Sequence, residues 1–373
     1  MEFSTLTTEF LVDQFNESTS NSSLYYEDWD YSPSHSYTLP AIAVRVTFIT
    51  ITAVLSIFSN LLCLLVLPTT TNSIPENNRI LMMSLSAADL GVGFVTSLSI
   101  APAIIGYWPY GNVICALSSA LMNVFSGISI FTLVLISLDR YCAVTQALRY
   151  PSLVTRKKTI TITISLWVFE MISCLVVFPL IGAPPDFNVS VAKCTPLWRP
   201  GKDTPVLLIA LTCTIIIPFI LMIFIYARLF LITRKQIKWI RQMNNLGRSL
   251  GNKSQAMSTH SDRKASRTFF TITIVFGIAW LPYTATSFYQ NLSGDVIHDT
   301  AQFIATWASV SSSWWDVMTF AGMNSSFRRA AKRLLARGFS RCLPESNRVV
   351  PININMSEHS RETVTMRNTV ETR

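Results

Sequence analysis

The run Val46–Leu67, VTFITITAVLSIFSNLLCLLVL, contains no charged residue and decides the class of fold. About 20 apolar residues in an α-helix, at about 1.5 Å of rise per residue, cross the ~30 Å hydrocarbon layer of a membrane. Inside that layer a single segment can satisfy its own backbone hydrogen bonds only as a helix. We therefore expect this run to be a transmembrane helix.

Six further segments meet the same test. Three of them each contain one acidic residue, Asp89, Glu170 or Asp316, and the other three contain no charge. We expect an all-α membrane protein, a seven-transmembrane helix bundle with a short amphipathic eighth helix. The expected parts are an N-terminal tail at 1–40, a helix domain at 41–323 (helices at 42–67, 79–107, 112–145, 159–183, 204–236, 263–290 and 299–323), the amphipathic helix at 324–338 and a disordered tail at 339–373.

The composition agrees with this class. Only 14% of the 373 residues are charged, whereas soluble domains carry about 25%. We therefore expect much of the surface to face lipid. The net charge of +9 is gathered in short stretches between the apolar segments, so we expect no nucleic-acid partner.

The distribution of basic residues predicts the orientation. The loops after the second, fourth and sixth spans contain only Lys193, Arg199 and Lys202, whereas those after the third and fifth spans are rich in Lys and Arg. Because basic loops stay in the cytoplasm, we expect the N-terminus outside and the C-terminus inside. This predicts a multi-pass protein of the plasma membrane.

Two kinds of modification follow from that orientation. Asn16, Asn21, Asn188 and Asn291 each begin an Asn-x-Ser triplet on the expected outer side, and we expect glycans there. Cys342 follows the amphipathic helix on the inner side and is a candidate for palmitoylation, with an unmodified thiol as the alternative.

Acidic residues inside a membrane are costly and therefore candidates for function. Asp89 and Asp316 lie near mid-depth, and if they face one another they cannot both ionise cheaply. Either a cation lies between them, or they are a protonated, hydrogen-bonded pair with a structural role. We interpret Glu170 as a neutral acid bonded to a neighbouring helix.

Several short motifs occur together in a specific order and spacing. The triplet Asp139-Arg140-Tyr141 closes the third span, where an Arg alone would only extend its charge toward the lipid head groups. The other motif residues are Asn60, Leu85, Ala88, Asp89, Cys115, Trp167, Pro218, Tyr226, Phe276 and Trp280-Leu281-Pro282-Tyr283. From about Ile42 to Arg337 the chain resembles the rhodopsin-like (class A) G-protein-coupled receptors. The stretch Asp139–Lys158 is most similar to the biogenic-amine branch.

The resemblance implies three sets of residues. It implies a disulfide between Cys115 and Cys194, and a sodium site made by Asp89, Ser129 and Asp316. It also implies an activation switch, in which Arg140 is restrained and then released to meet a G protein. The switch comprises Asp139, Arg140, Tyr141, Asp262, Tyr226, Trp280, Pro282, Phe276, Ile130 and Pro218.

The chain departs from the amine receptors at the ligand anchor. Met122 stands where they carry the amine-binding aspartate, and Val310 replaces the tyrosine that braces it. The usual Asn-Pro-x-x-Tyr motif reads Asp316-Val317-Met318-Thr319-Phe320. We therefore expect a neutral or lipophilic small ligand. The expected pocket comprises Met122, Asn123, Ser126, Ala210, Thr214, Trp280, Tyr283, Thr284, Ser287, Thr306 and Val310.

The expected partners are a heterotrimeric G protein, arrestin, a receptor kinase, membrane lipid and an extracellular ligand of unknown identity. Sodium as an allosteric modulator is the only cofactor we expect, and we expect no enzymatic activity. One alternative is a constitutively active or ligandless receptor. A more remote alternative is a transporter or channel, but the sequence lacks the internal repeats typical of transporters.

Overall fold

The computed structural model describes residues 37–71, 74–181, 185–196, 204–245 and 252–342. The chain divides into two units, Met1–Arg45 and Val46–Arg373. In the described part of the first unit, the Arg45 guanidinium lies 3.7 Å from the centre of the Tyr37 ring. The second unit contains the helix bundle.

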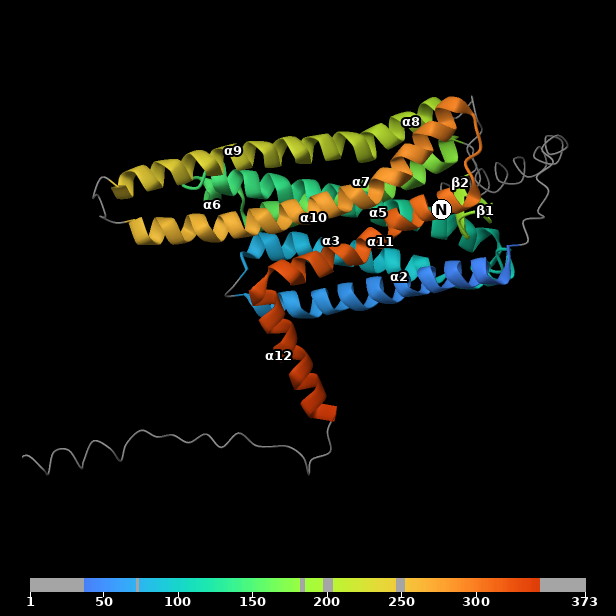
Figure 1. Ribbon diagram of the computed structural model, residues 1–373, viewed down its shortest axis with the longest axis horizontal. Helices are drawn as coiled ribbons and strands as arrows, with labels where there is room; N and C mark the ends of the chain where they lie inside the picture. Colours follow the sequence, from blue (N-terminus) through green and yellow to red (C-terminus); the bar gives the residue numbers. More distant parts are fainter. Residues whose placement is uncertain (1–36, 72–73, 182–184, 197–203, 246–251, 343–373) are drawn as a thin grey trace, which may run out of the picture. The chain divides into compact units, whose positions relative to one another are not determined.

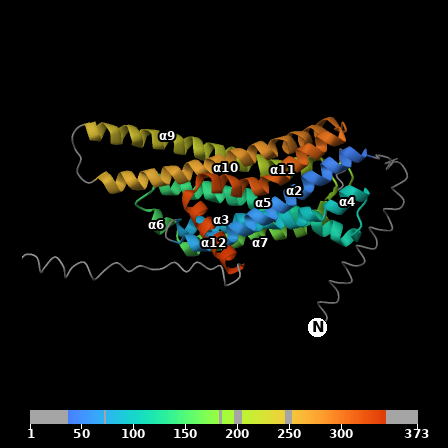
Figure 2. The ribbon, with the colours of Figure 1, turned by 60° about the horizontal axis from the view of Figure 1, so that its bottom comes forward.

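Helices occupy all seven expected spans, which confirms the fold class. Figures 1 and 2 show α3, α5, α7, α9, α10 and α11 running side by side, and α5 contacts α3, α7, α9 and α10. The elements are α2 (Leu39–Val66), η1 (Leu67–Thr70), α3 (Glu76–Ser97), α4 (Ile100–Ile105), α5 (Gly111–Thr145), α6 (Tyr150–Leu153), α7 (Arg156–Ile181), β1 (Pro185–Asn188), β2 (Lys193–Pro196), α8 (Thr204–Leu211), the π-helix η2 (Thr212–Ile216), α9 (Ile217–Asn245), α10 (Asn252–Ser293), α11 (Asp299–Met323) and α12 (Ser325–Cys342).

Length and composition alone identify five membrane-crossing stretches among the described residues. They are Leu39–Thr70, Glu76–Ile105, Gly111–Thr145, Thr204–Gln236 and Ser266–Ser293. The remaining two expected spans coincide with α7 and α11. Three consecutive serines at positions 311–313 lower the mean hydropathy of α11, because their hydroxyl groups are polar. These serines are buried inside the bundle.

The second span is divided, where the sequence predicts one continuous helix at 79–107. The helix α3 ends at Ser97 and α4 begins at Ile100. Pro102 in α4 has no N–H to donate to the carbonyl group of Leu98 one turn earlier, which explains the break. The fifth span contains the π-turn η2 just before the buried Pro218, which likewise removes a hydrogen bond from the helix.

Two helices extend beyond the expected bounds. The helix α10 begins at Asn252 rather than at 263, and α12 continues to Cys342 rather than ending at 338. The extension of α10 is mostly polar, whereas that of α12 includes Phe339. Hydropathy marks only the part of a helix that lies in lipid, so it does not detect a helix that continues into water.

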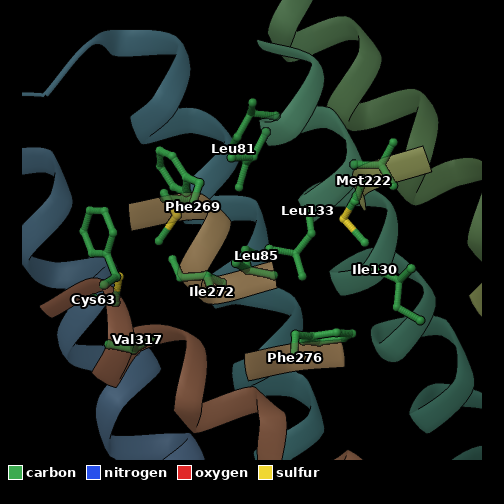
Figure 3. Close-up of a cluster of buried hydrophobic side chains, with 14 of the residues drawn as sticks. Cys63, Leu81, Leu85, Ile130, Leu133, Met222, Phe269, Ile272, Phe276 and Val317 are labelled. Atoms are coloured by element: carbon green, nitrogen blue, oxygen red, sulfur yellow. The ribbon is translucent and has the colours of Figure 1, made fainter. Parts of the chain in front are cut away.

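The main apolar core runs along the bundle from the end that contains Arg140 to Leu207 and Leu211 of α8. Figure 3 shows side chains from α2, α3, α5, α9, α10 and α11 meeting there, among them Leu85, Ile130, Met222 and Phe276. The core reaches α12 through Phe327, which is fully buried. The first turn of α12 is capped by Asn324, whose Oδ1 accepts hydrogen bonds from the backbone N–H groups of Ser326 and Phe327 at 3.1 Å each.

A short hairpin lies at the other end of the bundle, which we call the hairpin end. The strands β1 and β2 are antiparallel, with Phe187 opposite Cys194 and Asn188 opposite Lys193. Both strands contact α5. The sequence analysis does not predict this hairpin, because its strands are too short to show an alternating pattern.

Candidate functional site

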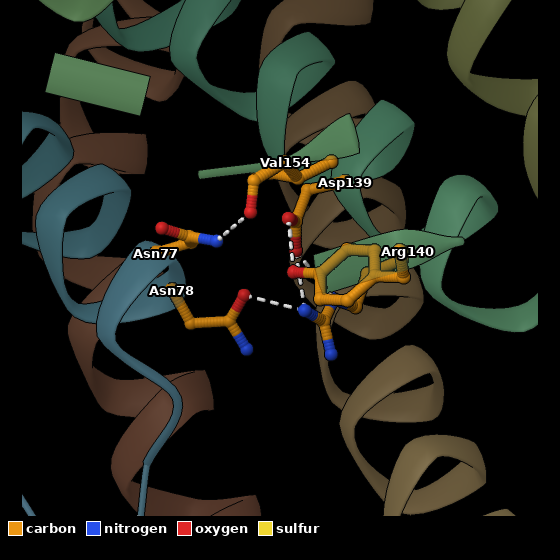
Figure 4. Close-up of polar contacts among 6 residues, drawn as sticks. Asn77, Asn78, Asp139, Arg140 and Val154 are labelled. Atoms are coloured by element: carbon orange, nitrogen blue, oxygen red, sulfur yellow. Dashed lines mark hydrogen bonds and ion pairs between the residues drawn. The ribbon is translucent and has the colours of Figure 1, made fainter. Parts of the chain in front are cut away.

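Asp139 and Arg140 form a buried ion pair near the C-terminal end of α5. The Nε of Arg140 donates to Oδ2 of Asp139 at 3.0 Å, and its Nη2 donates to the same oxygen. That Nη2 also donates to Oδ1 of Asn78 on α3 at 2.6 Å, as Figure 4 shows. Asp139 is 5% exposed and Arg140 is 2% exposed, so the pair is shielded from water. Arg140 is therefore held by two helices.

A second contact holds the carboxylate of this pair. The hydroxyl of Tyr150, in the short helix α6, donates to Oδ1 of Asp139 at 2.7 Å. Burial, and then the charge of Asp139, raise the pKa of Tyr150 to about 12, so the hydroxyl keeps its proton at neutral pH. Asn77 donates to the carbonyl group of Val154 at 2.9 Å and ties α3 to the segment after α6.

The sequence analysis names Asp139 and Arg140 but misses Asn77, Asn78 and Tyr150. No spacing rule connects α3 to the end of α5, so only the fold brings these side chains together. Tyr141 is partly buried and packs against the main core. Asp262, the other expected partner of Arg140, has a side chain that lies outside the described residues.

Phe276 and Trp280, two aromatic residues of the expected switch, form one stack with Phe219, which the sequence does not predict there. The ring of Phe276 lies between Phe219, with centroids 5.8 Å apart, and Trp280, with centroids 5.6 Å apart. The Nε1 of Trp280 donates to the hydroxyl of Ser312 on α11 at 3.2 Å. Ile130 belongs to the same core, and Pro282 lies inside α10. A shift of Trp280 would therefore be passed directly to Phe276.

Tyr226 lies further along the same core. Ser137 on α5 donates to its hydroxyl at 3.1 Å. Phe320, which replaces the tyrosine of the usual motif on α11, packs against Phe269 and Phe327 instead, with centroids 6.2 Å and 5.2 Å away. The C-terminal end of α11 is thus held by aromatic packing.

The two mid-depth acids belong to one buried polar region. Ser129 donates to Oδ1 of Asp89 at 2.7 Å, and Asp316 lies within electrostatic range of Asp89. Each acid is 1% exposed. Among the described residues, Oδ2 of Asp89 and both carboxyl oxygens of Asp316 have no hydrogen-bond partner, and neither does Oδ1 of nearby Asn60. Unsatisfied buried oxygen atoms are costly, and together they suit a small hard cation.

The residues of the expected pocket lie on five elements near the hairpin end. Met122, Thr306 and Val310 are buried, whereas Asn123 is exposed and donates to the carbonyl group of Ser119 at 2.8 Å. Thr214 and Thr284 donate to carbonyl groups of their own helices. The partly buried members are Ser126, Ala210, Thr214, Tyr283, Thr284 and Ser287.

Met122 and Val310 belong to a single apolar cluster. Its buried members also include Val92, Phe303 and Trp307, and Ala192 from the hairpin. Met122, which stands where the amine receptors carry the aspartate, therefore packs in an apolar cluster. One turn away on the same helices as Met122 and Val310, the buried residues Ser119 and Thr306 carry hydroxyl groups.

The disulfide between Cys115 and Cys194 is present, with the Cα atoms 5.4 Å apart, which confirms the expected pairing. Of the expected glycan sites, Asn188 ends β1 and Asn291 donates to the carbonyl group of Ser287 at 2.8 Å. Asn16 and Asn21 lie outside the described residues, as does the side chain of Cys342.

Glu170 on α7 packs against a glycine of α5. A Cβ atom placed on Gly127 would lie 2.5 Å from Oε2 of Glu170. The acid is 9% exposed, and no hydrogen bond from it is present among the described residues. Gly127 therefore allows the close approach, which the sequence analysis does not predict.

Comparisons with known proteins agree with this geometry. The model of the family described as "7 transmembrane receptor (rhodopsin family)" matches residues 59–316, well over half of the chain. The histamine H2 receptor of Rattus norvegicus is 28% identical over 315 residues, which cover 80% of this chain and 82% of that protein. Trace amine-associated receptors 8b of Rattus norvegicus and 8c of Mus musculus are each 30% identical over 291 residues, covering 76% of this chain and 83% of each receptor.

Proposed function

This chain belongs to the rhodopsin family of seven-transmembrane receptors, and we propose that its ligand is a neutral or lipophilic small molecule rather than a simple amine. Members of this family are receptors, not enzymes. The protein is therefore a multi-pass membrane receptor that couples an external ligand to G-protein signalling.

The apolar surroundings of Met122 and Val310 carry the proposal about the ligand. The relatives named above are receptors for histamine and trace amines, and their similarity makes an amine the obvious competing ligand. An ammonium group placed at Met122 would lose its water and meet mainly a thioether and hydrocarbon. Asn123 and Thr306 would offer hydrogen bonds but no compensating charge. Losing one partner of a buried charge pair costs about 2–5 kcal/mol, roughly 30- to several-thousand-fold in affinity.

The signal would travel through the stack of aromatic residues. A ligand near Trp280 would shift its ring against Phe276, and the core around Ile130 and Pro218 would repack. The resting contacts of Arg140 with Asp139 and Asn78 would then break, and Arg140 would meet the G protein. Asp262 is a further proposed restraint on Arg140, and Tyr141 and Tyr226 are proposed to take part in the same movement.

We propose sodium as an allosteric modulator, held by Asp89, Ser129 and Asp316. The unpartnered carboxyl oxygens of the two acids fit such an ion. The ion would offset the cost of burying two carboxylates in a low-dielectric region. These residues would favour the resting arrangement of α3, α5 and α11 by drawing the three helices together.

The remaining proposals concern topology and partners. The excess of Lys and Arg in the loops after the third and fifth spans supports an external N-terminus and a cytoplasmic C-terminus in the plasma membrane. The external sequons would then carry glycans, and Cys342 would carry a palmitoyl group. Arrestin, a receptor kinase and membrane lipid are the further partners that we propose.

The test compares the native receptor with a variant that restores the missing anchor. We expect no second-messenger response of the native receptor to a panel of simple amines at micromolar concentration. The double variant Met122→Asp, Val310→Tyr should gain a response, because the ammonium group regains its charged partner. The matched control is Asn123→Asp, which places an acid one position away.

Two results would contradict the proposal. One is a dose-dependent amine response of the native receptor that is lost in Glu170→Gln and kept in Met122→Ala. The other is an equal gain in the double variant and in Asn123→Asp. A signal in cells with the receptor but without any added ligand would support the alternative of a constitutively active or ligandless receptor.

A further inference from the structure

The turn between β1 and β2 is inserted into the helix bundle. Val191 is 2% exposed and Ala192 is 3% exposed, values as low as those of the helix cores. Ser190 is buried as well. A turn between two strands normally lies at the surface, because its backbone groups need water. Here the turn is shielded from water and contacts the bundle instead.

Three contacts fix the turn in this place. The indole Nε1 of Trp307 on α11 donates to the carbonyl oxygen of Val191 at 3.0 Å, and Trp307 is fully buried. The hydroxyl of Ser190 donates to Oδ1 of Asp299 at the start of α11 at 2.8 Å. On the other side, Cys194 is joined to Cys115 of α5 by the disulfide. The turn is therefore held between α5 and α11.

The side chain of Ala192 belongs to the apolar cluster that contains Met122, which stands where the amine receptors carry their aspartate. The cluster joins Ala192 to Trp307, Met122 and Val310. Ala192 is also the one non-glycine residue with positive φ, at 54°, among the described residues. An alanine is held in that region of φ only where its surroundings determine it, so packing of the turn against the bundle sets this conformation.

We propose that the turn Ser190–Ala192 is a built-in occupant of the ligand subsite at Met122 and Val310, so that an external ligand reaches this subsite only by displacing the turn. This inference rests on the proposed function of the protein as a receptor for a small ligand. The occupant supplies what a bound small molecule would supply, namely a hydrogen-bond acceptor for Trp307 and a methyl group for the apolar cluster. A ligand reaches the subsite only where its own contacts outweigh those of the turn, and a restored charged partner at Met122 would help an amine to do so.

The test measures how fast a reagent reaches Met122. The full-length receptor with Met122→Cys is treated from outside with a small cationic methanethiosulfonate, and the rate of labelling at this position is measured by mass spectrometry. In a second protein, Ser190, Val191 and Ala192 are also replaced by glycine, which keeps the chain length and Cys194. We expect the second protein to be labelled at least ten-fold faster. The matched control is Asp186→Ala with Met122→Cys, because Asp186 is an exposed residue of the same hairpin.

A second variant tests the proposal if the glycine replacement does not reach the cell surface. Trp307→Phe with Met122→Cys removes the N–H donor and keeps an aromatic ring, so it should also speed labelling. The proposal would be overturned if Met122→Cys with the native turn were labelled as fast as the folded variants in which the turn is altered. The labelling involves no ligand and no G protein. A failed proposal about the neutral ligand would therefore leave these rates unchanged, and the two failures can be distinguished.

Discussion

The guanidinium of Arg140 donates a hydrogen bond of 2.6 Å to Oδ1 of Asn78, and both side chains are buried. This contact links α5 to α3 at the end where the G protein would bind. The ion pair with Asp139 lies within α5 alone and does not restrain one helix against another. Asn78 is therefore the described residue that ties Arg140 to a second helix.

Replacing Asn78 should raise basal signalling. A hydrogen bond to a charged group contributes about 1.5–3 kcal/mol, so Asn78→Ala should shift the equilibrium toward the released form of Arg140 by roughly ten- to a hundred-fold. Second-messenger levels without ligand, corrected for surface expression, measure this shift. The control is Asn77→Ala, which removes the bond to Val154 and the contact with Tyr150 but no direct contact of Arg140. Equal effects of the two variants would mean that α3 is merely destabilised.

Asp262 tests whether α10 adds a further restraint. Asp262→Ala should raise the basal signal, and Arg140→Ala should reduce or abolish it, because the freed guanidinium is the group proposed to meet the G protein. If only Asn78→Ala raises the signal, Asp262 is a solvated charge.

Sodium should stabilise the resting receptor more than potassium does. We expect a higher melting temperature and a lower basal signal in sodium than in potassium at equal ionic strength. Asp89→Asn should remove the difference, because it removes the charge beside Ser129. Equal responses to the two salts would leave only general screening of charge.

Loss of the disulfide should strongly reduce surface expression. A native disulfide contributes about 2–5 kcal/mol, and here it also anchors the hairpin. Cys115→Ala and Cys194→Ala should each lower the amount of receptor detected by an antibody on intact cells. Cys142→Ala, which removes a free cysteine, is the control. Normal surface levels of both disulfide variants would show that the bridge does not support folding.

The hairpin should become more stable as the pH rises above neutrality. Burial lowers the pKa of Lys193 to about 8, whereas an unfolded lysine has a pKa of about 10.4. Between these values the unfolded state binds more protons, so the free energy of unfolding rises with pH, by on the order of 1–3 kcal/mol. Below pH 8 both states are charged, and above pH 10.4 both are neutral.

Hydrogen exchange of the hairpin amides between pH 7 and 10, corrected for intrinsic rates, measures this change. Lys193→Met should stabilise the hairpin at pH 7 and remove the rise. Replacing the exposed Lys158 with Met should leave the rise in hairpin stability with pH unchanged. A rise that persists in Lys193→Met would assign it to another group.

The sequence predicts the parts of this fold that depend on solvent. Charge-free runs such as Val46–Leu67 place the helices, because the membrane requires them to be apolar. The pairing of Cys115 with Cys194 came from the resemblance to a family and is confirmed. The break before Pro102 was missed, although proline is a visible signal, because hydropathy is continuous across it.

The contacts around the candidate site depend on tertiary packing and were not predictable. Asn78 and Arg140 are 62 positions apart, and no local rule connects them. The sequence does not predict the insertion of the hairpin turn, because the three apolar residues there, Val189, Val191 and Ala192, are too few to form a pattern. The sequence shows Met122 in place of the aspartate of the amine receptors. It does not show that Ala192 packs in the same apolar cluster as Met122.

The packing of Phe320 determines which residues are tolerated at this position. Its ring is 2% exposed and contacts Phe269 and Phe327, in the place where the usual motif has tyrosine. Phe320→Tyr would place a hydroxyl beside these rings, and without a hydrogen-bond partner that hydroxyl would cost about 1–3 kcal/mol. The tyrosine of the usual motif is therefore tolerated here only together with a second substitution that supplies a hydrogen-bond partner.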